Sequence, residues 1–192
     1  MPSAQPRPRN AAATRAAILQ SAIEHFADAG YDGAGVRQIA KDAGVTAMLV
    51  NRYFGSKAQL FAEAVEIAFA PPVFVVEESD TVARNAAAAL VSRTGPAGDP
   101  PKSFLIMLLS VSDPVAVRIV REAIERHVGQ RLARQIDRPD RELRTELVLS
   151  VISGVLLMRS VVGTRALREG DPEDIAGILE AVFDAIIGTP AG

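Results

Sequence analysis

One short stretch of the chain gathers cationic and hydrogen-bonding side chains that suit contact with a nucleic acid. Arg37, Arg52 and Lys57 can donate hydrogen bonds to phosphate oxygens. An arginine fork can also donate to O6 and N7 of guanine together, so we expect Arg37 to reach a base edge rather than remain a solvated surface residue. Thr46 and Asn51 lie between these cations, and the Asn51 amide can bind a phosphate or an adenine. Together these side chains could hold a duplex backbone and read its bases.

Three neighbouring positions complete the candidate DNA-contacting set, and two of them have an alternative role. Ala47 would face the floor of a DNA groove at the start of a helix. Met48 could pack on a thymine methyl group or, as readily, against Phe26 or Leu60. Tyr53 could contact a phosphate or belong to the core. The sequence leaves both alternatives open.

The elements expected around these residues form a helix-turn-helix pattern. Ile39 would face inward from the first helix, and Gly44 stands in the turn, where a left-handed backbone costs a glycine least. Thr46 can cap the second helix, a role that competes with DNA contact because one hydroxyl serves only one of them well. Val50 and Phe54 would bury the inner side of the second helix, and its outer side would lie in the major groove.

Many positions in and before this pattern match one protein family in fixed register. They are Ile18, Leu19, Ala22, Phe26, Gly30, Tyr31, Val36, Ile39, Ala40, Ala43, Gly44, Val45, Tyr53, Phe54, Ser56, Lys57, Leu60 and Phe61. The first third of the chain therefore resembles the N-terminal domain of the tetracycline-repressor (TetR) family of transcription regulators. Asn51 stands where the family usually has a tyrosine, and Met48 where it often has a glycine. Ala34 and Gly35 replace hydroxyl residues, so only backbone N–H groups could hold a phosphate there.

The resemblance implies an all-α fold and a ligand-responsive regulator of transcription. We expect a disordered arm over residues 1–12, a three-helix helix-turn-helix DNA-binding domain over 13–57, and a helical bundle over 58–192 that binds an effector and dimerises. The implied function is a repressor that binds a near-palindromic double-stranded DNA operator as a homodimer and is released by an unidentified small hydrophobic effector. The alternative is a helical small-molecule-binding or protein-interaction module without sequence-specific DNA binding, which the intact cations disfavour.

Periodicity and end signals predict about nine helices and no sheet. The expected ranges are 14–29, 36–43, 47–53, 56–70, 81–93, 102–111, 114–136, 143–167 and 175–187. Ser56 with Gln59 three residues later has the spacing of a capping box, and Asp171 can cap the last helix ahead of Pro172. The β-branched run at 73–76 has no partner strand, so we expect a loop there.

The last two predicted helices are apolar over more than one stripe, which indicates burial on two sides. In a domain this small we expect the second side to face another subunit, and the family resemblance implies dimerisation through these helices. The expected interface residues are Val151, Gly154, Val155, Ile175, Ile178, Leu179, Val182, Phe183 and Ile186. The alternative is that both helices are simply central in one monomer.

The middle helices offer apolar wall residues and a few polar anchors for a small-molecule site. The candidates are Phe104, Met107, Ser110, Val120, Ile124, His127, Ser153, Met158 and Arg159. The alternative is that these positions are ordinary core. Arg159 lies in an apolar run and needs a partner, which could be Glu146, Glu180, Asp184 or an anionic effector.

Charge and composition narrow the remaining function classes. Residues 1–57 carry seven cations and four acids, whereas the whole 192-residue chain has a net charge of −2, so a basic N-terminal part precedes an acidic remainder. With no cysteine there is neither a disulfide nor a thiolate metal site, and we expect no metal and no cofactor. The glycine-rich segment 95–103 fails as a phosphate loop because Pro101 has no N–H to donate. We expect a cytoplasmic protein without a membrane span and without enzymatic activity.

Overall fold

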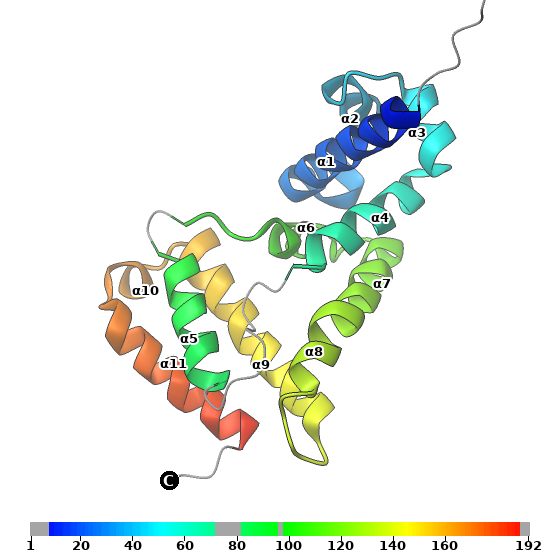
Figure 1. Ribbon diagram of the computed structural model, residues 1–192. Helices are drawn as coiled ribbons and strands as arrows, with labels where there is room; N and C mark the ends of the chain where they lie inside the picture. Colours follow the sequence, from blue (N-terminus) through cyan, green and yellow to red (C-terminus); the bar gives the residue numbers. More distant parts are fainter. Residues whose placement is uncertain (1–7, 72–81, 96–97, 189–192) are drawn as a thin grey trace, which may run out of the picture. The chain divides into compact units, whose positions relative to one another are not determined.

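The computed structural model describes residues 8–71, 82–95 and 98–188, and every regular element among them is a helix (Figure 1). The α-helices are α1 (Pro8–Gly33), α2 (Val36–Asp42), α3 (Ala47–Phe54), α4 (Lys57–Phe69), α5 (Val82–Arg93), α6 (Lys102–Ser110), α7 (Pro114–Ala123), α8 (Gln130–Ala133), α9 (Arg141–Leu156), α10 (Arg165–Glu169) and α11 (Pro172–Ile187). Two π-helical segments, η1 (Ile124–Gly129) and η2 (Leu157–Val161), continue α7 and α9. The predicted all-α class is confirmed. Within the described ranges, no helix has the length and apolar character needed to cross a membrane.

The chain forms two compact units, and the first contains the helix-turn-helix. Unit 1 comprises Met1–Ala70 and Lys102–Ala123, so α1 to α4 share it with α6 and α7. Aromatic rings fill its centre: Phe26 meets Phe61 edge-on with ring centroids 4.8 Å apart, and Tyr31 meets the same Phe61 ring at 5.0 Å. Edge-to-face pairs of this kind add to the stabilisation that burial provides. The core thus fastens α4 directly to α1.

The compact units divide the chain differently from the boundary expected at residue 57. Because Phe61 of α4 enters the aromatic core and α6 packs along α1, helices assigned to the effector domain fold together with the helix-turn-helix. Of the arm expected over 1–12, residues 1–7 lie outside the described part, and α1 begins at Pro8. The loop expected at 73–76 also lies outside the described residues.

Unit 2 comprises Pro71–Pro101 and Ile124–Gly192, and its core is aliphatic with one central phenylalanine. Helix α5 packs along α11, and α9 contacts both α11 and α8. Its most deeply buried large side chains are Leu90, Leu132, Ile136, Leu156 and Phe183. Apolar burial of this kind, at about 25 cal/mol per Å² removed from water, is the main term that holds these helices together.

Two of the predicted long helices are interrupted. The range 143–167 is helical from Arg141 only to Val161, because Gly163 adopts a positive φ of 70° and the chain restarts as α10. The range 114–136 runs through α7, η1 and α8 and ends at Ala133. By contrast, the predicted caps are confirmed, since Ser56 Oγ accepts from the Gln59 backbone N–H and Asp171 accepts from two first-turn N–H groups of α11.

Helices α1 and α6 approach each other without a side chain between them at one point. Gly30 breaks the helical conformation near the end of α1 with φ 67° and ψ −175°, a combination that is essentially limited to glycine. A Cβ atom at this position would collide with the backbone carbonyl of Leu109. Next to it, the Tyr31 N–H donates to the buried Ser110 hydroxyl at 3.0 Å. The kink in α1 is therefore held against the C-terminal end of α6.

Candidate nucleic-acid interface

The turn between α2 and α3 has the geometry that the sequence predicts. Gly44 has a φ of 69°, and the Val45 N–H donates to the Ala40 carbonyl at 2.9 Å across the turn. No Cβ contact would hinder a side chain at Gly44, so its backbone conformation alone accounts for the glycine. The turn orients α3 so that Val50 and Phe54 enter the core of unit 1.

Thr46 caps α3, and its side chain is exposed. Its hydroxyl accepts a hydrogen bond from the Leu49 backbone N–H at 3.3 Å. Of its two expected roles, the cap is therefore seen in the structure. DNA contact by Thr46 stays a prediction.

The outward face of α3 carries Met48, Asn51 and Arg52, all of which are exposed. Met48 is 82% exposed and does not pack against Phe26 or Leu60, both of which are buried in the core of unit 1. The expected alternative for Met48, a core role, is therefore wrong. The three side chains are spaced three and four residues apart, so they share one side of the helix.

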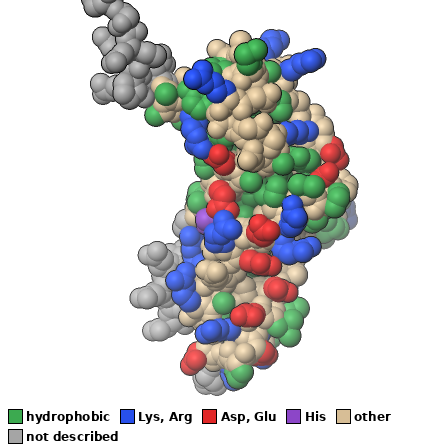
Figure 2. Space-filling view, turned by 90° about the vertical axis from the view of Figure 1, so that its right-hand side faces the viewer, with side chains coloured by type: hydrophobic (Ala, Val, Ile, Leu, Met, Phe, Trp, Pro, Cys, Tyr) green, Lys and Arg blue, Asp and Glu red, His purple; other side chains and the backbone are tan. Residues whose placement is uncertain are grey.

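Arg37 on α2 adds a second exposed cation next to this face. Neither Arg37 nor Arg52 forms an ion pair or hydrogen bond with any other described residue, so both guanidinium groups are available to a ligand. Figure 2 shows several lysine and arginine side chains at the tip of unit 1, the end that carries α2 and α3 in Figure 1, and others spread over the rest of the same face. Positive charge at this end favours phosphate contact.

Lys57 and Tyr53 are held partly within the protein. The Lys57 ammonium group donates to the Asp32 carbonyl at 3.3 Å and lies 4.8 Å from the centre of the Tyr31 ring. The Tyr53 ring is half-buried, 6.3 Å from that of Phe54. Tyr53 thus keeps both of its expected roles, whereas Lys57 must give up a local contact if its ammonium group is to reach a phosphate.

A hydrogen-bonded cluster that sequence reasoning missed fastens the end of α2 to α1. His25 Nε2 donates to Asp42 Oδ2 at 2.7 Å, and Gln38 Nε2 donates to Asp42 Oδ1 at 3.1 Å. The hydrogen bond from His25 lowers the pKa of the Asp42 carboxyl below its usual range, because it favours the charged form. The four-residue spacing of Gln38 and Asp42 could have predicted their hydrogen bond from sequence. The contact with His25 could not be predicted, because it depends on how α1 crosses α2.

Comparison with known proteins agrees with this geometry over most of the chain. Residues 18–64 match the family of bacterial regulatory proteins named after tetR, and residues 80–187 match the tetracyclin repressor-like C-terminal domain. The chain belongs to the TetR family. It is accordingly a DNA-binding regulator of transcription, as the N-terminal residues had indicated.

Individual TetR-family relatives resemble this chain to different extents. The HTH-type transcriptional repressor SCO4008 of Streptomyces coelicolor is 38% identical over 58 residues, and the match spans 30% of each chain. A TetR-family regulator, SCO0857, from Streptomyces coelicolor A3 has a solved structure that matches 97% of this chain and 100% of its own, with 27% identity and a TM-score of 0.56. The structure of the multidrug binding protein EbrR complexed with proflavin matches 90% and 99% of the two chains with 21% identity and a TM-score of 0.60, which shows a shared fold.

The candidate effector residues of this TetR-family chain are divided between the two compact units. Unit 1 holds Phe104, Met107, Ser110 and Val120, and unit 2 holds Ile124, His127, Ser153, Met158 and Arg159. The Ser110 hydroxyl is already bonded to the backbone of α1, and Met158 is exposed. Met107, Ile124, His127 and Ser153 are half-buried, as expected for side chains that could line a pocket.

Arg159 has a structural role that differs from both expectations. It is 3% exposed, and its guanidinium donates to the Leu167 carbonyl at 2.8 Å, to the Val91 carbonyl at 3.1 Å and to the Thr94 hydroxyl at 3.0 Å. None of the expected acids pairs with it, and Glu180 pairs with Arg84 instead. Burial lowers the pKa of Arg159 from its ordinary value, yet the carbonyls at the ends of α5 and α10 compensate its charge.

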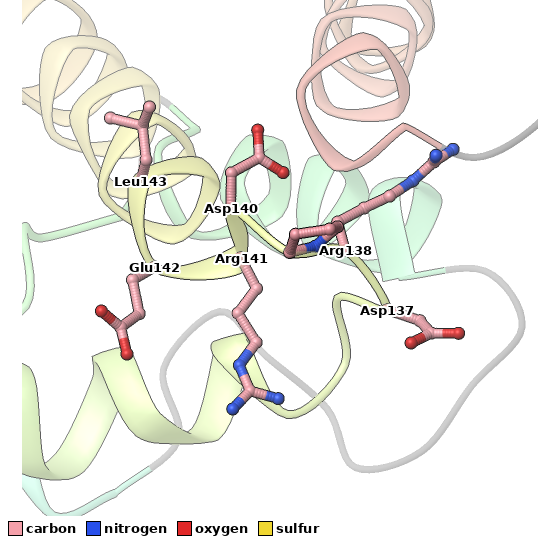
Figure 3. Close-up of a pocket in the computed structure, with 7 residues that line it drawn as sticks. Asp137, Arg138, Asp140, Arg141, Glu142 and Leu143 are labelled. Carbon is pink, nitrogen blue, oxygen red and sulfur yellow. The ribbon is translucent and has the colours of Figure 1, made fainter.

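Figure 3 shows a hollow on unit 2 that does not suit a hydrophobic effector. It is lined by seven consecutive residues, Asp137 to Leu143, of which five are charged. The side chains of Glu142, Arg141 and Asp137 diverge from one another and do not converge on a common point (Figure 3). The apolar walls expected of a small-molecule site are absent from this hollow.

The predicted dimer residues fall into three groups by burial in the structure of the protomer. Leu179 and Phe183 are buried in the core of unit 2, because their side of α11 faces α5 and α9, so their prediction as interface residues is wrong. Ile178, Val182 and Gly154 are exposed. The others, Val151, Val155, Ile175 and Ile186, are half-buried.

Proposed function

We propose that this TetR-family regulator is a homodimeric repressor that binds a near-palindromic operator and is released by a small hydrophobic effector. The observation that carries the DNA-binding part is the outward face of α3, where Met48, Asn51 and Arg52 project from a helix whose opposite side is buried. A helix with this division of faces can enter the major groove without unfolding any part of unit 1. One short helix reads few base pairs, so two copies on a twofold axis would supply the specificity.

An exposed apolar face on unit 2 supports the homodimer. On α11, Ile178 is 67% exposed and Val182 37%, and on the adjoining helix α9, Leu147 is 46% exposed. Gly154 and Gly177 have open space in front of them, so the backbone of a partner helix could approach closely. Exposed apolar side chains on two adjoining helices are typical of a protein–protein interface. We therefore assign this surface, the α9–α11 face, to the contact between two protomers.

The effector part of the proposal rests on the C-terminal domain. The match to the tetracyclin repressor-like C-terminal domain and the fold shared with EbrR, a multidrug binding protein solved with proflavin, favour a small-molecule site. Ile124 and His127 of unit 2 are half-buried, as side chains that line a pocket would be. A ligand can release DNA only if it binds one conformation of the protein better than the other.

The test of the DNA-binding role is a binding-site selection from random duplexes, followed by gel-shift titration of the selected duplex and of the DNA upstream of the protein's own gene. We expect selective, salt-sensitive binding by the wild-type protein. A helical module without sequence-specific DNA binding would instead select no common site, which would refute the proposal.

The Arg52→Ala variant is expected to bind about five- to tenfold more weakly to selected and unrelated duplexes alike. Arg52 is exposed near the end of α3, where a cation contacts phosphate and does not read bases. The slope of log affinity against log salt concentration should fall by roughly one for each lost phosphate contact. The matched control is Arg118→Ala on α7, an exposed arginine far along the chain from the helix-turn-helix. Equal losses in the two variants would contradict the assignment.

A further inference from the structure

Met48 is an exposed apolar side chain that shares the outward face of α3 with the polar side chains of Asn51 and Arg52. It is 82% exposed, more than any other large apolar residue in the described part of the chain. It lies one helical turn before Asn51 and Arg52, on the side of α3 opposite Val50 and Phe54. An exposed apolar side chain in the middle of a binding face gains free energy only when a ligand removes it from water.

The surroundings of Met48 do not suit a protein partner. Thr46, Asn51 and Arg52 are exposed near it, and Met48 is the one exposed large apolar side chain of α3, whereas Ala47 and Leu49 beside it are half-buried. An apolar interface needs a far larger area than one methionine provides. The ligand that suits one apolar group set among hydrogen-bonding groups is a base edge that itself combines polar atoms with one apolar group.

We propose that Met48 reads the C5 methyl group of a pyrimidine in the major groove, and so determines one position of each operator half-site. This inference rests on the proposed function and adds a chemical identity to one contact. In the major groove the methyl group of thymine is the apolar feature that distinguishes base pairs, and 5-methylcytosine presents the same group. The unbranched thioether side chain of methionine is flexible and polarisable, so it can adjust to a methyl group without a fixed hydrogen-bond geometry.

The experiment removes the methyl group from DNA and leaves every hydrogen-bonding atom in place. In the duplex selected by the wild-type protein, each thymine is replaced in turn by deoxyuridine, and affinity is measured by gel-shift titration. At one position in each half-site, replacement by deoxyuridine is expected to lower the affinity of the wild-type protein about fourfold. This is the factor that corresponds to the burial of one methyl-sized group. In a parallel set, each cytosine is replaced by 5-methylcytosine. A loss with deoxyuridine identifies thymine as the natural source of the methyl group, and a gain with 5-methylcytosine identifies the methylated base; either result supports the proposal.

Substitutions of Met48 decide whether this residue is the reader. Met48→Ala should bind the thymine and deoxyuridine duplexes equally at the sensitive position, whereas Met48→Leu, which keeps an apolar side chain, should retain most of the difference. The matched control is Ile67→Ala, which removes an exposed apolar side chain from α4 and should preserve the full difference. Circular dichroism confirms that each variant is folded.

Two outcomes would overturn the inference and leave the proposed function intact. The first is selective binding by the wild-type protein with no position sensitive to either base analogue. The second is an unchanged deoxyuridine penalty in Met48→Ala, which would assign the methyl contact to another residue. Absence of any selective binding would instead remove the proposed function, and the inference with it.

Discussion

The Ile178→Asp variant is expected to be monomeric in solution and to bind the operator roughly a thousandfold more weakly than the wild-type protein. Ile178 is the most exposed large apolar side chain of the α9–α11 face and contributes little to the protomer's own core. At a twofold interface the substitution would bury one aspartate carboxylate from each protomer among apolar side chains. Burying an unpaired charge costs free energy, so the dimer would be destabilised. A monomer has one recognition helix, so its affinity should approach that of non-specific binding.

Sedimentation equilibrium gives the mass of the variant, and gel-shift titration gives its affinity for the selected duplex. The matched control is Val111→Asp, which introduces the same charge at an exposed valine that follows α6 in unit 1. Val111→Asp should remain dimeric and bind the operator. A folded, dimeric Ile178→Asp variant would contradict the assignment of the α9–α11 face.

The Arg159→Met variant is expected to lower the free energy of unfolding by about 2–4 kcal/mol. The substitution keeps an unbranched chain of similar length but removes three hydrogen-bond donations, and it leaves the carbonyls of Val91 and Leu167 and the Thr94 hydroxyl without that partner. An unsatisfied buried acceptor costs about 1–3 kcal/mol, and relief from the burial of a charge offsets part of the sum. Denaturant titration at fixed protomer concentration measures the change.

Two further variants test the structural role of Arg159. Arg84→Met removes an exposed arginine that forms an ion pair with Glu180. Such a pair contributes at most about 1 kcal/mol to the free energy of unfolding. Arg159→Lys keeps the charge but lacks the planar fork, so it should be less stable than the wild-type protein and more stable than Arg159→Met. If Arg159→Met were as stable as the wild-type protein, the three hydrogen bonds would not be the reason for this buried arginine.

The helix-turn-helix could be predicted from sequence because its signals are local. The turn needs a glycine at position 44, and the caps of α3, α4 and α11 are formed by Thr46, Ser56 and Asp171 with residues only two or three positions away. Each of these contacts is set by backbone geometry over a few residues. The outward placement of Asn51 and Arg52 then follows from the burial of Val50 and Phe54.

The parts that sequence did not predict depend on contacts between distant segments. The partners of Arg159 are Val91 on α5, Thr94 directly after α5 and Leu167 on α10. They lie 65 to 68 residues before it and 8 residues after it, and the sequence does not mark them because two of the three acceptors are backbone carbonyls. Similarly, the membership of α6 and α7 in unit 1 follows from how α6 packs on α1. The end of the helix at Val161 was readable in principle, because Gly163 is present, but a glycine inside an apolar run is equally compatible with a continuing helix.

The backbone contact between Gly30 and Leu109 has a consequence for how movement passes through unit 1. Side chains absorb small displacements by changing rotamer, but here main chain touches main chain, and the neighbouring Tyr31–Ser110 hydrogen bond restrains sliding. The end of α6 therefore cannot shift along α1 without displacing the kink itself. We expect α1 and α6 to move together as one rigid body.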